Sequence, residues 1–342
     1  MSADTTTSPA FIYGRPVQPG EFLNRKGELR TAFNRLRHCE STAVVGEPHI
    51  GKSSLLLKLA DQETRRTYLG DDGNGMVFCL LDMHPIGGDY GPASFWQEAL
   101  EPLSESSDDE TLAPLLAKAA EEGYARRSLE RLFSHLGGKE KKLVLLMDEF
   151  ERLLLHPSFQ DPAFFALLRS LATRTGGLAI ITASRLTVAQ MNDQGRSLLE
   201  IGSPFFNNVI EMRLRPFDDV TVGRFLQQTG DAFTPEDRRF VRRVAGRHPF
   251  LLQALCAALA ETTGSDRQAR AAELFYERIA FHFDDLWRTL DDRTRTTAVI
   301  LSLVELGGRV GAGLFLRRDR AGGCLWSGTA QAGRAGPGRV DG

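Results

Sequence analysis

The sequence predicts an α/β protein in which a five-stranded parallel sheet, within residues 11–215, precedes a separate helical domain. Two observations predict this fold class. Between residues 40 and 215, short β-rich apolar runs alternate with longer amphipathic runs, which is typical of a parallel sheet covered by helices. From Pro216 onward the strand signals fade, and apolar residues recur at three- and four-residue spacing, which indicates helices.

The strands are predicted where apolar runs are nearly continuous, because strands buried on both faces of a sheet have no polar side. The clearest case is the run 143–147, which ends in an acidic pair. We expect strands over Ser41–Val45, Met76–Asp82, Leu143–Asp148, Leu178–Ala183 and Asn208–Leu214. The helices between them are expected over Lys52–Thr64, Pro92–Leu103, Ala125–Leu136 and Pro162–Thr175.

The helical domain is predicted over residues 216–286, with helices over 220–228, 235–245, 250–263 and 267–285. The second of these is well marked, because Thr234 can cap it, Pro235 suits its first position and Gly246 can close it. A further small helical unit is expected within 287–316. The terminal segments 1–10 and 317–342 have no hydrophobic period, so we expect both to be disordered.

Composition places the chain among soluble globular proteins without naming a partner. Its 342 residues are 42% hydrophobic and 25% charged, which allows two domains with separate cores. A net charge of -2 gives no support for DNA binding, although a local basic patch remains possible. The four cysteines are scattered, so a reducing cytoplasm is expected. No apolar run reaches the roughly 20 residues of a membrane span, and we expect no membrane association.

Residues 46–54 have the sequence of a phosphate-binding loop, Gly-Glu-Pro-His-Ile-Gly-Lys-Ser-Ser, between a predicted strand and a predicted helix. The backbone N–H groups of such a loop and the positive end of the helix neutralise phosphates. Lys52 is expected to bridge the β- and γ-phosphates, and Ser53 to bind Mg²⁺. The nucleotide contacts are predicted at Gly46, Glu47, Pro48, His49, Ile50, Gly51, Lys52, Ser53 and Ser54.

A second acidic element follows the apolar strand 143–147. Asp148 is expected to hold Mg²⁺ through water, and Glu149 to polarise the attacking water as a general base. The alternative is two acids at the exposed end of a strand, which becomes less favoured once a phosphate-binding loop is present. The sequence lacks the Asn-Lys-x-Asp motif of guanine-specific GTPases, and the preference for ATP over GTP as the ligand has only family resemblance as its ground.

These motifs together resemble the additional-strand, catalytic-glutamate division of P-loop NTPases, which includes the AAA+ and STAND ATPases. The resemblance implies the strand order 5-1-4-3-2. The segment Thr182–Arg185 is similar to the sensor segment of STAND and NB-ARC ATPases, which implies that Arg185 reads the γ-phosphate. Without the resemblance, Arg185 would fit an ordinary surface arginine after a strand.

Both flanks of the sheet domain extend the resemblance over about residues 11–315. The segment 22–29 resembles the Phe-x-Gly-Arg-x-x-Glu-Leu box of STAND and origin-recognition-type ATPases, which implies that Arg25 lies near adenine; Asn24 replaces the glycine. The segment 246–252 resembles the Gly-x-Pro lid motif with one extra residue, which implies a base contact from Pro249. Helix capping alone would also explain that proline. Bacterial AAA-like proteins of STAND type commonly continue into a winged helix, which would be incomplete within 287–316.

Three functions fit these residues. The first is an ATP-binding and slowly ATP-hydrolysing switch of STAND type that acts on a protein partner or on further copies of itself. The second is a DNA-associated AAA+ ATPase of the origin-recognition or transposition-helper kind, with Arg196 as its finger arginine. Its basic patch would comprise Arg293, Arg295, Arg317, Arg318 and Arg320. The third is a truncated scaffold that binds nucleotide without hydrolysis.

Overall fold

The structure is a computed structural model that describes residues 11–106, 110–199 and 208–307. The chain divides into two compact units after Ile279, inside its longest helix. The expected disordered segments 1–10 and 317–342 lie outside the described residues. No helix in the described ranges is long and apolar enough to cross a membrane.

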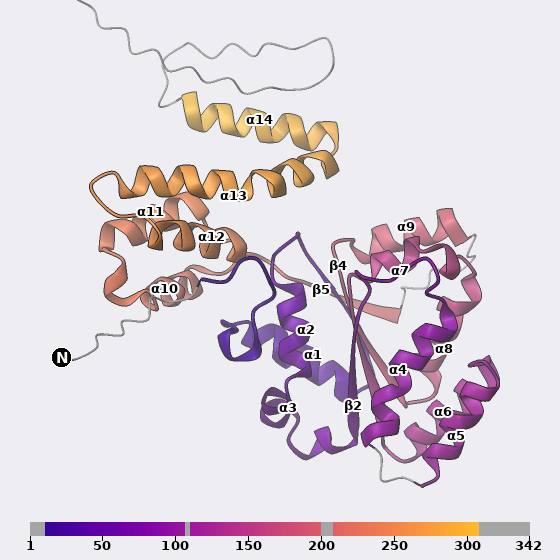
Figure 1. Ribbon diagram of the computed structural model, residues 1–342. Helices are drawn as coiled ribbons and strands as arrows, with labels where there is room; N and C mark the ends of the chain where they lie inside the picture. The colour runs from indigo at the N-terminus through magenta and orange to yellow at the C-terminus, as the bar shows by residue number, and fades with distance from the viewer. Residues whose placement is uncertain (1–10, 107–109, 200–207, 308–342) are drawn as a thin grey trace, which may run out of the picture. The chain divides into compact units, whose positions relative to one another are not determined.

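The first unit contains a five-stranded sheet in the order β2-β3-β4-β1-β5, in which every neighbouring pair is parallel (Figure 1). This is the expected order 5-1-4-3-2 listed from the opposite edge, and the prediction is confirmed. The strands are β1 Ser41–Val45, β2 Met76–Asp82, β3 Lys142–Asp148, β4 Leu178–Ser184 and β5 Val209–Arg213. Since all five run the same way, the residues that follow them gather at one edge of the sheet.

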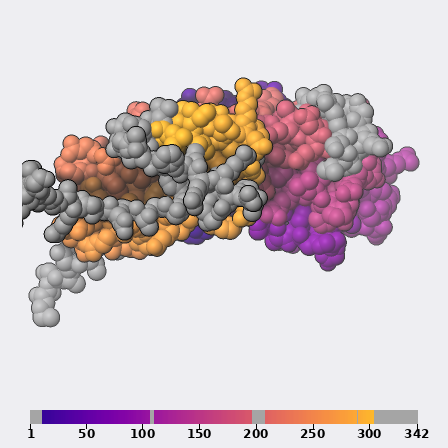
Figure 2. Space-filling view, turned by 90° about the horizontal axis from the view of Figure 1, so that it is seen from above, coloured from indigo at the N-terminus to yellow at the C-terminus, as the bar shows by residue number. Residues whose placement is uncertain are grey.

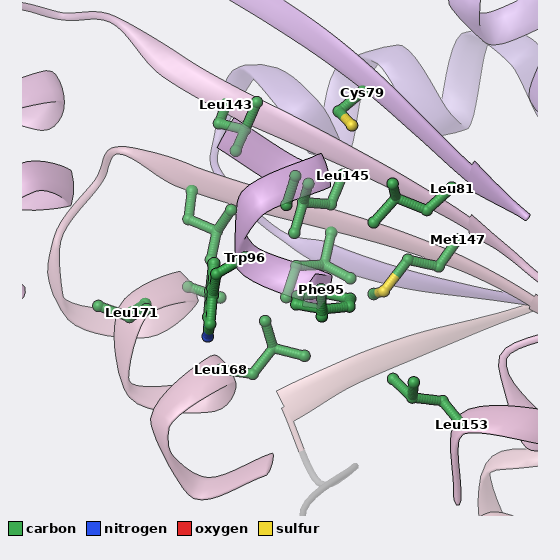
Figure 3. Packing of buried hydrophobic residues seen from close by; sticks show 14 of the residues in the cluster. Cys79, Leu81, Phe95, Trp96, Leu143, Leu145, Met147, Leu153, Leu168 and Leu171 are labelled. Carbon is green, nitrogen blue, oxygen red and sulfur yellow. The ribbon is translucent and has the colours of Figure 1, made fainter. Parts of the chain in front are cut away.

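Side chains of β3 alternate between two buried layers, as the two-residue period of a strand requires. Leu143, Leu145 and Met147 belong to one apolar cluster, whereas Val144 and Leu146 belong to the other. Figure 3 shows the first cluster, in which Phe95 and Trp96 pack with Leu168 and Leu171. Its main helices are α4 Pro92–Ser106, α5 Leu112–Glu121, α6 Arg126–Gly138 and α8 Pro162–Arg174.

The opposite face of the sheet is covered by α1, α2 and α3, as Figure 1 shows. These helices are α1 Lys26–Arg37, α2 Lys52–Ala60 and α3 Gln62–Leu69. Two short helices follow the strands at the carboxyl edge, α7 Glu151–Leu155 and α9 Val188–Leu199. Short 3₁₀ helices occur at Pro19–Glu21, Gly70–Gly75, Pro157–Phe159 and Gly230–Ala232.

One predicted helix is broken. The expected single helix Lys52–Thr64 ends at Ala60, because Asp61 adopts an extended conformation and its carboxylate caps α3 by accepting the Thr64 N–H at 2.9 Å. The strand expected over Leu143–Asp148 also begins one residue earlier than predicted. Lys142 begins β3, and its ammonium donates to the carbonyls of Leu36 and Arg37.

The helical part of the first unit comprises α10 Asp219–Gln227, α11 Pro235–Ala245, α12 Pro249–Ala260 and α13, which begins at Arg267 and ends at Thr289 in the second unit. The predicted cap of α11 is confirmed as a reciprocal capping box between Thr234 and Asp237. Phe11 and Tyr13 pack on this helical core, not on the sheet: Phe11 stacks on Phe233, and Tyr13 meets Phe250 edge-on.

The second unit, as far as it is described, contains the end of α13 and helix α14, Asp292–Gly307. Part of α14, in yellow, lies at the surface seen in Figure 2. Several of its apolar side chains are exposed, namely Ile300, Leu301 and Leu303. The remainder of the expected winged-helix-like region, residues 308–316, lies outside the described residues.

Candidate nucleotide-binding site

The phosphate-binding loop joins β1 to α2, as the sequence predicts. Two of its glycines are required by geometry. A Cβ at Gly46 would lie 3.0 Å from both the Leu214 carbonyl and the Ile50 side chain, and Gly51 has a φ of +99°. No atom lies within 4 Å of the Cβ position of Gly51, so the backbone is open to a ligand at the start of α2. The remaining loop positions Glu47, Pro48 and His49 connect these two turns.

Lys52 is the first residue of α2, and its side chain folds back over the loop. Its ammonium donates to the carbonyls of Gly46 at 3.0 Å and Glu47 at 2.9 Å. Burial lowers the pKa of Lys52, while the charges of Glu151, Asp148 and Glu149 oppose that shift, in that order. A cation surrounded by carbonyls and carboxylates at a helix start is suited to receive a phosphate group.

The two serines after Lys52 have different partners. The Ser53 hydroxyl hydrogen-bonds to Asp148, so the loop and the end of β3 meet at this point. The Ser54 side chain is buried and accepts the Val17 N–H at 3.1 Å. Ser54 therefore ties the preceding segment to α2, and a nucleotide contact from this residue would come from its backbone N–H.

Asp148 and Glu149 follow β3 with different surroundings. Burial raises the pKa of Asp148, against the hydrogen bonds from Ser53 and from the Glu149 N–H. Glu149 has a φ of +48°, and its half-exposed carboxylate accepts Arg152 Nε at 2.6 Å. The strained backbone turns Glu149 away from the strand direction directly after the predicted magnesium ligand.

Ser53 and Asp148 supply an oxygen pair that fits a hard cation such as Mg²⁺. Among the described residues, no group of three or more His, Cys, Asp or Glu side chains is arranged to hold a metal ion. A magnesium ion at this pair would take its other ligands from phosphate oxygens and water, as it usually does in phosphate sites.

Arg185 follows β4 at the same edge of the sheet, where the sequence places it. Its Nε lies 3.2 Å from Oε1 of Glu151, and its backbone N–H donates to the same oxygen at 3.3 Å. Glu151 was not among the predicted site residues. Its side chain is 5% exposed, and its Oε2 has no hydrogen-bond partner among the described residues.

In the segment before the loop, the buried residue Arg25 makes the main contacts with the site. Its guanidinium donates to the carbonyls of Ile50 and Arg215 at 3.1 and 2.8 Å and pairs with Glu28. Asn24 has a φ of +61°, which explains why the related motif carries glycine: asparagine tolerates this left-handed conformation better than other side chains do. The Asn24 amide also donates to Thr221, which links this segment to α10.

The helical domain contacts the loop through the residues around Pro249. Pro249 is the first residue of α12, and Gly246 closes α11 with a φ of +61°. The His248 ring donates to the Pro48 carbonyl, and the Phe250 ring stacks on His49 at 4.8 Å. Burial lowers the pKa of His248 to about 4, so the ring is neutral at physiological pH. His248 lay within the predicted motif but had no predicted role.

The residues predicted for DNA contact are only partly described. Arg196 lies on α9, but its side chain is outside the described residues, as are Arg317, Arg318 and Arg320. Arg295 donates to the carbonyls of Trp287 and Arg288, and it pairs with Asp292. Arg293 lies two residues before it on α14.

Solved structures with a similar fold are distant in sequence. A Walker-type ATPase of Pyrococcus abyssi aligns with a TM-score of 0.59 at 17% identity, over 82% of this chain and 80% of that one. The ORC2 protein of Aeropyrum pernix, in its ADPNP–ADP complexes, aligns with a TM-score of 0.57 at 12% identity, over 88% and 80% of the two chains. At these identities the likeness establishes the fold alone.

The sequence matches two families of AAA type, and no curated protein matches it. The family described as AAA domain matches residues 35–185, which include the phosphate-binding loop and both acids after β3. The family described as AAA-like domain matches residues 126–304, more than half of the chain. With its P-loop NTPase fold and these motifs at one sheet edge, the chain belongs to the AAA-like domain family.

Proposed function

We propose that this protein is an ATP-binding and ATP-hydrolysing switch of STAND type, in which the helical domain responds to the nucleotide held by the phosphate-binding loop. The observation that carries the proposal is the direct contact between the two regions. His248 and Phe250 of the helical domain touch Pro48 and His49 of the loop. A change in the loop backbone on nucleotide binding would therefore alter these contacts at the start of α12.

The residues at the sheet edge divide the chemistry of hydrolysis among them. Lys52 and Arg185 place two cations where the γ-phosphate of a bound ATP would lie, and they stabilise the charge that develops on its oxygens. Glu149 accepts a proton from the water that attacks the γ-phosphorus, while the bond to the oxygen of ADP breaks. Ser53 and Asp148 would hold a magnesium ion, which when bound neutralises charge on the phosphates.

Arg25 and Pro249 are proposed to flank the base. Arg25 fixes the loop at Ile50 and the exit of β5 at Arg215, and its guanidinium lies 5.2 Å from the Phe217 ring at the entry to the helical domain. Phe217 in turn donates its N–H to the Arg247 carbonyl, next to the Gly-x-Pro-like segment. This chain of contacts joins the proposed adenine end of the site to the helical domain.

A switch requires that ATP stabilise one arrangement of the helical domain more than ADP does. Exchange of the amide hydrogens of residues 246–248 and 250 measures this, with a non-hydrolysable ATP analogue, with ADP and without nucleotide, each in the presence of Mg²⁺. We expect the slowest exchange with the ATP analogue. Equal exchange in all three states would contradict the switch, even if the protein hydrolyses ATP.

A DNA-associated AAA+ ATPase is the second candidate. It is favoured by the likeness in fold to ORC2 and by the arginines on α14. Binding to a labelled DNA duplex at 50 and 200 mM salt tests it, because phosphate contacts release counterions and make affinity depend steeply on salt. Strong salt-dependent binding would support this function, and no binding at the lower salt would exclude it.

The third candidate is a scaffold that binds nucleotide without hydrolysis. Measured turnover of ATP distinguishes it from the two ATPase candidates. Release of phosphate from ATP by the wild-type chain, above that of the Glu149→Gln variant, supports an enzyme. Equal background rates would leave a nucleotide-binding scaffold. Light scattering with ATP and with ADP then shows whether the proposed partner includes further copies of the chain.

A further inference from the structure

Glu151 is a buried acid at the edge of the candidate site that the proposed chemistry leaves unused. It is the first residue of α7, three positions after Asp148. Its Oε1 faces Arg185, and its Oε2 lies buried with no hydrogen-bond partner among the described residues. Glu149, two residues earlier, is by contrast 41% exposed and paired with Arg152.

Keeping a carboxylate in such a place costs stability. Burial removes its hydration, and one ion pair with an unmatched second oxygen repays that cost incompletely. Replacing both partners of a buried ion pair with apolar residues of similar volume is often neutral or stabilising in proteins. The burial of Glu151 therefore points to a role in binding or chemistry rather than in folding.

The geometry of the ion pair shows what Glu151 does to Arg185. The carboxylate meets the guanidinium at Nε, on its side, and also accepts the Arg185 backbone N–H. The Arg185 side chain is 47% exposed, and no other described residue forms an ion pair or a hydrogen bond with it. A guanidinium held at Nε keeps its two terminal nitrogens for a second anion.

Glu151 acts on the other cation of the site as well. Three nearby carboxylates oppose the lowering of the Lys52 pKa by burial. Glu151 has the largest effect of the three, ahead of Asp148 and Glu149. Lys52 and Arg185 repel each other across the site. The negative charge of Glu151 offsets this repulsion, which helps two cations to face one phosphate group.

We propose that Glu151 is a positioning residue that orients Arg185 and, by its charge, supports Lys52, so that both cations serve the terminal phosphate of a nucleoside triphosphate. The inference deepens the proposed function and rests on it. Because a nucleoside diphosphate has no γ-phosphate, Glu151 favours ATP over ADP, and it contributes little to ADP binding. It touches neither water nor substrate in the hydrolysis step.

The test compares wild type with Glu151→Gln, which keeps the shape of the side chain and removes its charge. Affinities for a non-hydrolysable ATP analogue and for ADP are measured by calorimetry with Mg²⁺, and kcat and KM by phosphate release. We expect a preference for the ATP analogue over ADP that is reduced about tenfold, in the range of one charged hydrogen bond, with ADP affinity nearly unchanged. Combined with Arg185→Ala, Glu151→Gln is expected to reduce the preference less than it does alone, because only its charge on Lys52 is then lost.

Asp237→Asn is the matched control, since it also neutralises a buried carboxylate but lies in the helical domain. It is expected to lower stability and to leave nucleotide preference unchanged. A Glu151→Gln variant with wild-type preference and kcat would overturn the inference while leaving the switch intact. Independent effects of Glu151→Gln and Arg185→Ala would overturn it too. If the wild-type chain binds neither nucleotide, the proposed function fails and the inference fails with it.

Discussion

Two buried carboxylates of this protein, Asp237 in the helical domain and Glu151 at the sheet edge, have opposite surroundings. Both oxygens of Asp237 are used: Oδ2 accepts from Thr234 and Arg267, and Oδ1 accepts from Gln268. Glu151 has one oxygen without a partner among the described residues. The first arrangement follows local rules of helix capping, whereas the second leaves a buried polar atom unmatched, which is typical of functional sites.

The largest expected effect lies at the sheet edge. Glu149→Gln removes the proposed general base and is expected to lower kcat by about a hundredfold to ten-thousandfold. The affinity for ATP and the free energy of unfolding should change little, because the Glu149 side chain is half-exposed. Steady-state phosphate release measures kcat. The control Glu130→Gln, on the exposed face of α6, should keep wild-type turnover; equal kcat in all three proteins would remove Glu149 from the chemistry.

Asp237→Ala is expected to show the reverse pattern. The change removes the carboxylate partner of Arg267 and the acceptor of the Thr234 N–H, which lowers the free energy of unfolding by about 3 kcal/mol. Urea unfolding measures the change. Turnover per folded molecule should stay at the wild-type value, and a loss of kcat beyond tenfold would show that the two regions do not differ as proposed.

His248 lies where the two regions meet, and its effect depends on pH. Its folded pKa of about 4 is below the ordinary value of 6.5, so only the unfolded chain gains a proton between these values. Stability from this group is thus complete above pH 6.5 and falls as pH is lowered toward 4, by up to about 3 kcal/mol.

His248→Gln keeps a donor for the Pro48 carbonyl and cannot titrate. The free energy of unfolding of both proteins is measured at pH 7 and at pH 4.5. The contribution of His248 is the stability that wild type loses between these pH values minus the stability that the variant loses. We expect the variant to lose less stability than wild type on acidification. Parallel losses in the two proteins would show that His248 is not buried against the loop.

The smallest effect is expected at Asn24, which links the segment before the loop to Thr221 of α10. Its left-handed backbone disfavours alanine, so Asn24→Ala should lower the free energy of unfolding by about 1 kcal/mol. Asn24→Gly restores the residue of the related motif and should lower it less. Urea unfolding measures both variants. If Asn24→Gly were less stable than Asn24→Ala, the conformational explanation would be refuted.

The sheet was largely predictable from sequence, because its strands are short and most of their residues are apolar. Predicted and observed strands differ by one residue at most at each end, as for β3 and β5. Strand order came from family resemblance, since apolar pattern does not determine which parallel strands are neighbours. The break at Asp61 was missed because the residues on both sides of it are compatible with one continuous helix.

The candidate site was predictable only where its residues are adjacent in sequence. The loop 46–54 and the pair Asp148–Glu149 form contiguous motifs, whereas Glu151 gains its importance from Arg185, which follows a different strand. In sequence, Glu151 is one of several acids after an apolar run. Its burial depends on how α7 and β4 meet, and no local pattern reports that.

The central claim is that the loop 46–54 binds ATP through Lys52, and ligand-dependent stabilisation tests it most directly. Thermal unfolding of wild type, Lys52→Ala and the control Lys118→Ala is measured with and without Mg²⁺ and ATP. Ligand at about 100 times its Kd stabilises a protein by about 2.7 kcal/mol. We predict a rise in Tm for wild type and for Lys118→Ala, and none for Lys52→Ala. An equal rise in all three, or no rise in wild type, would contradict the claim.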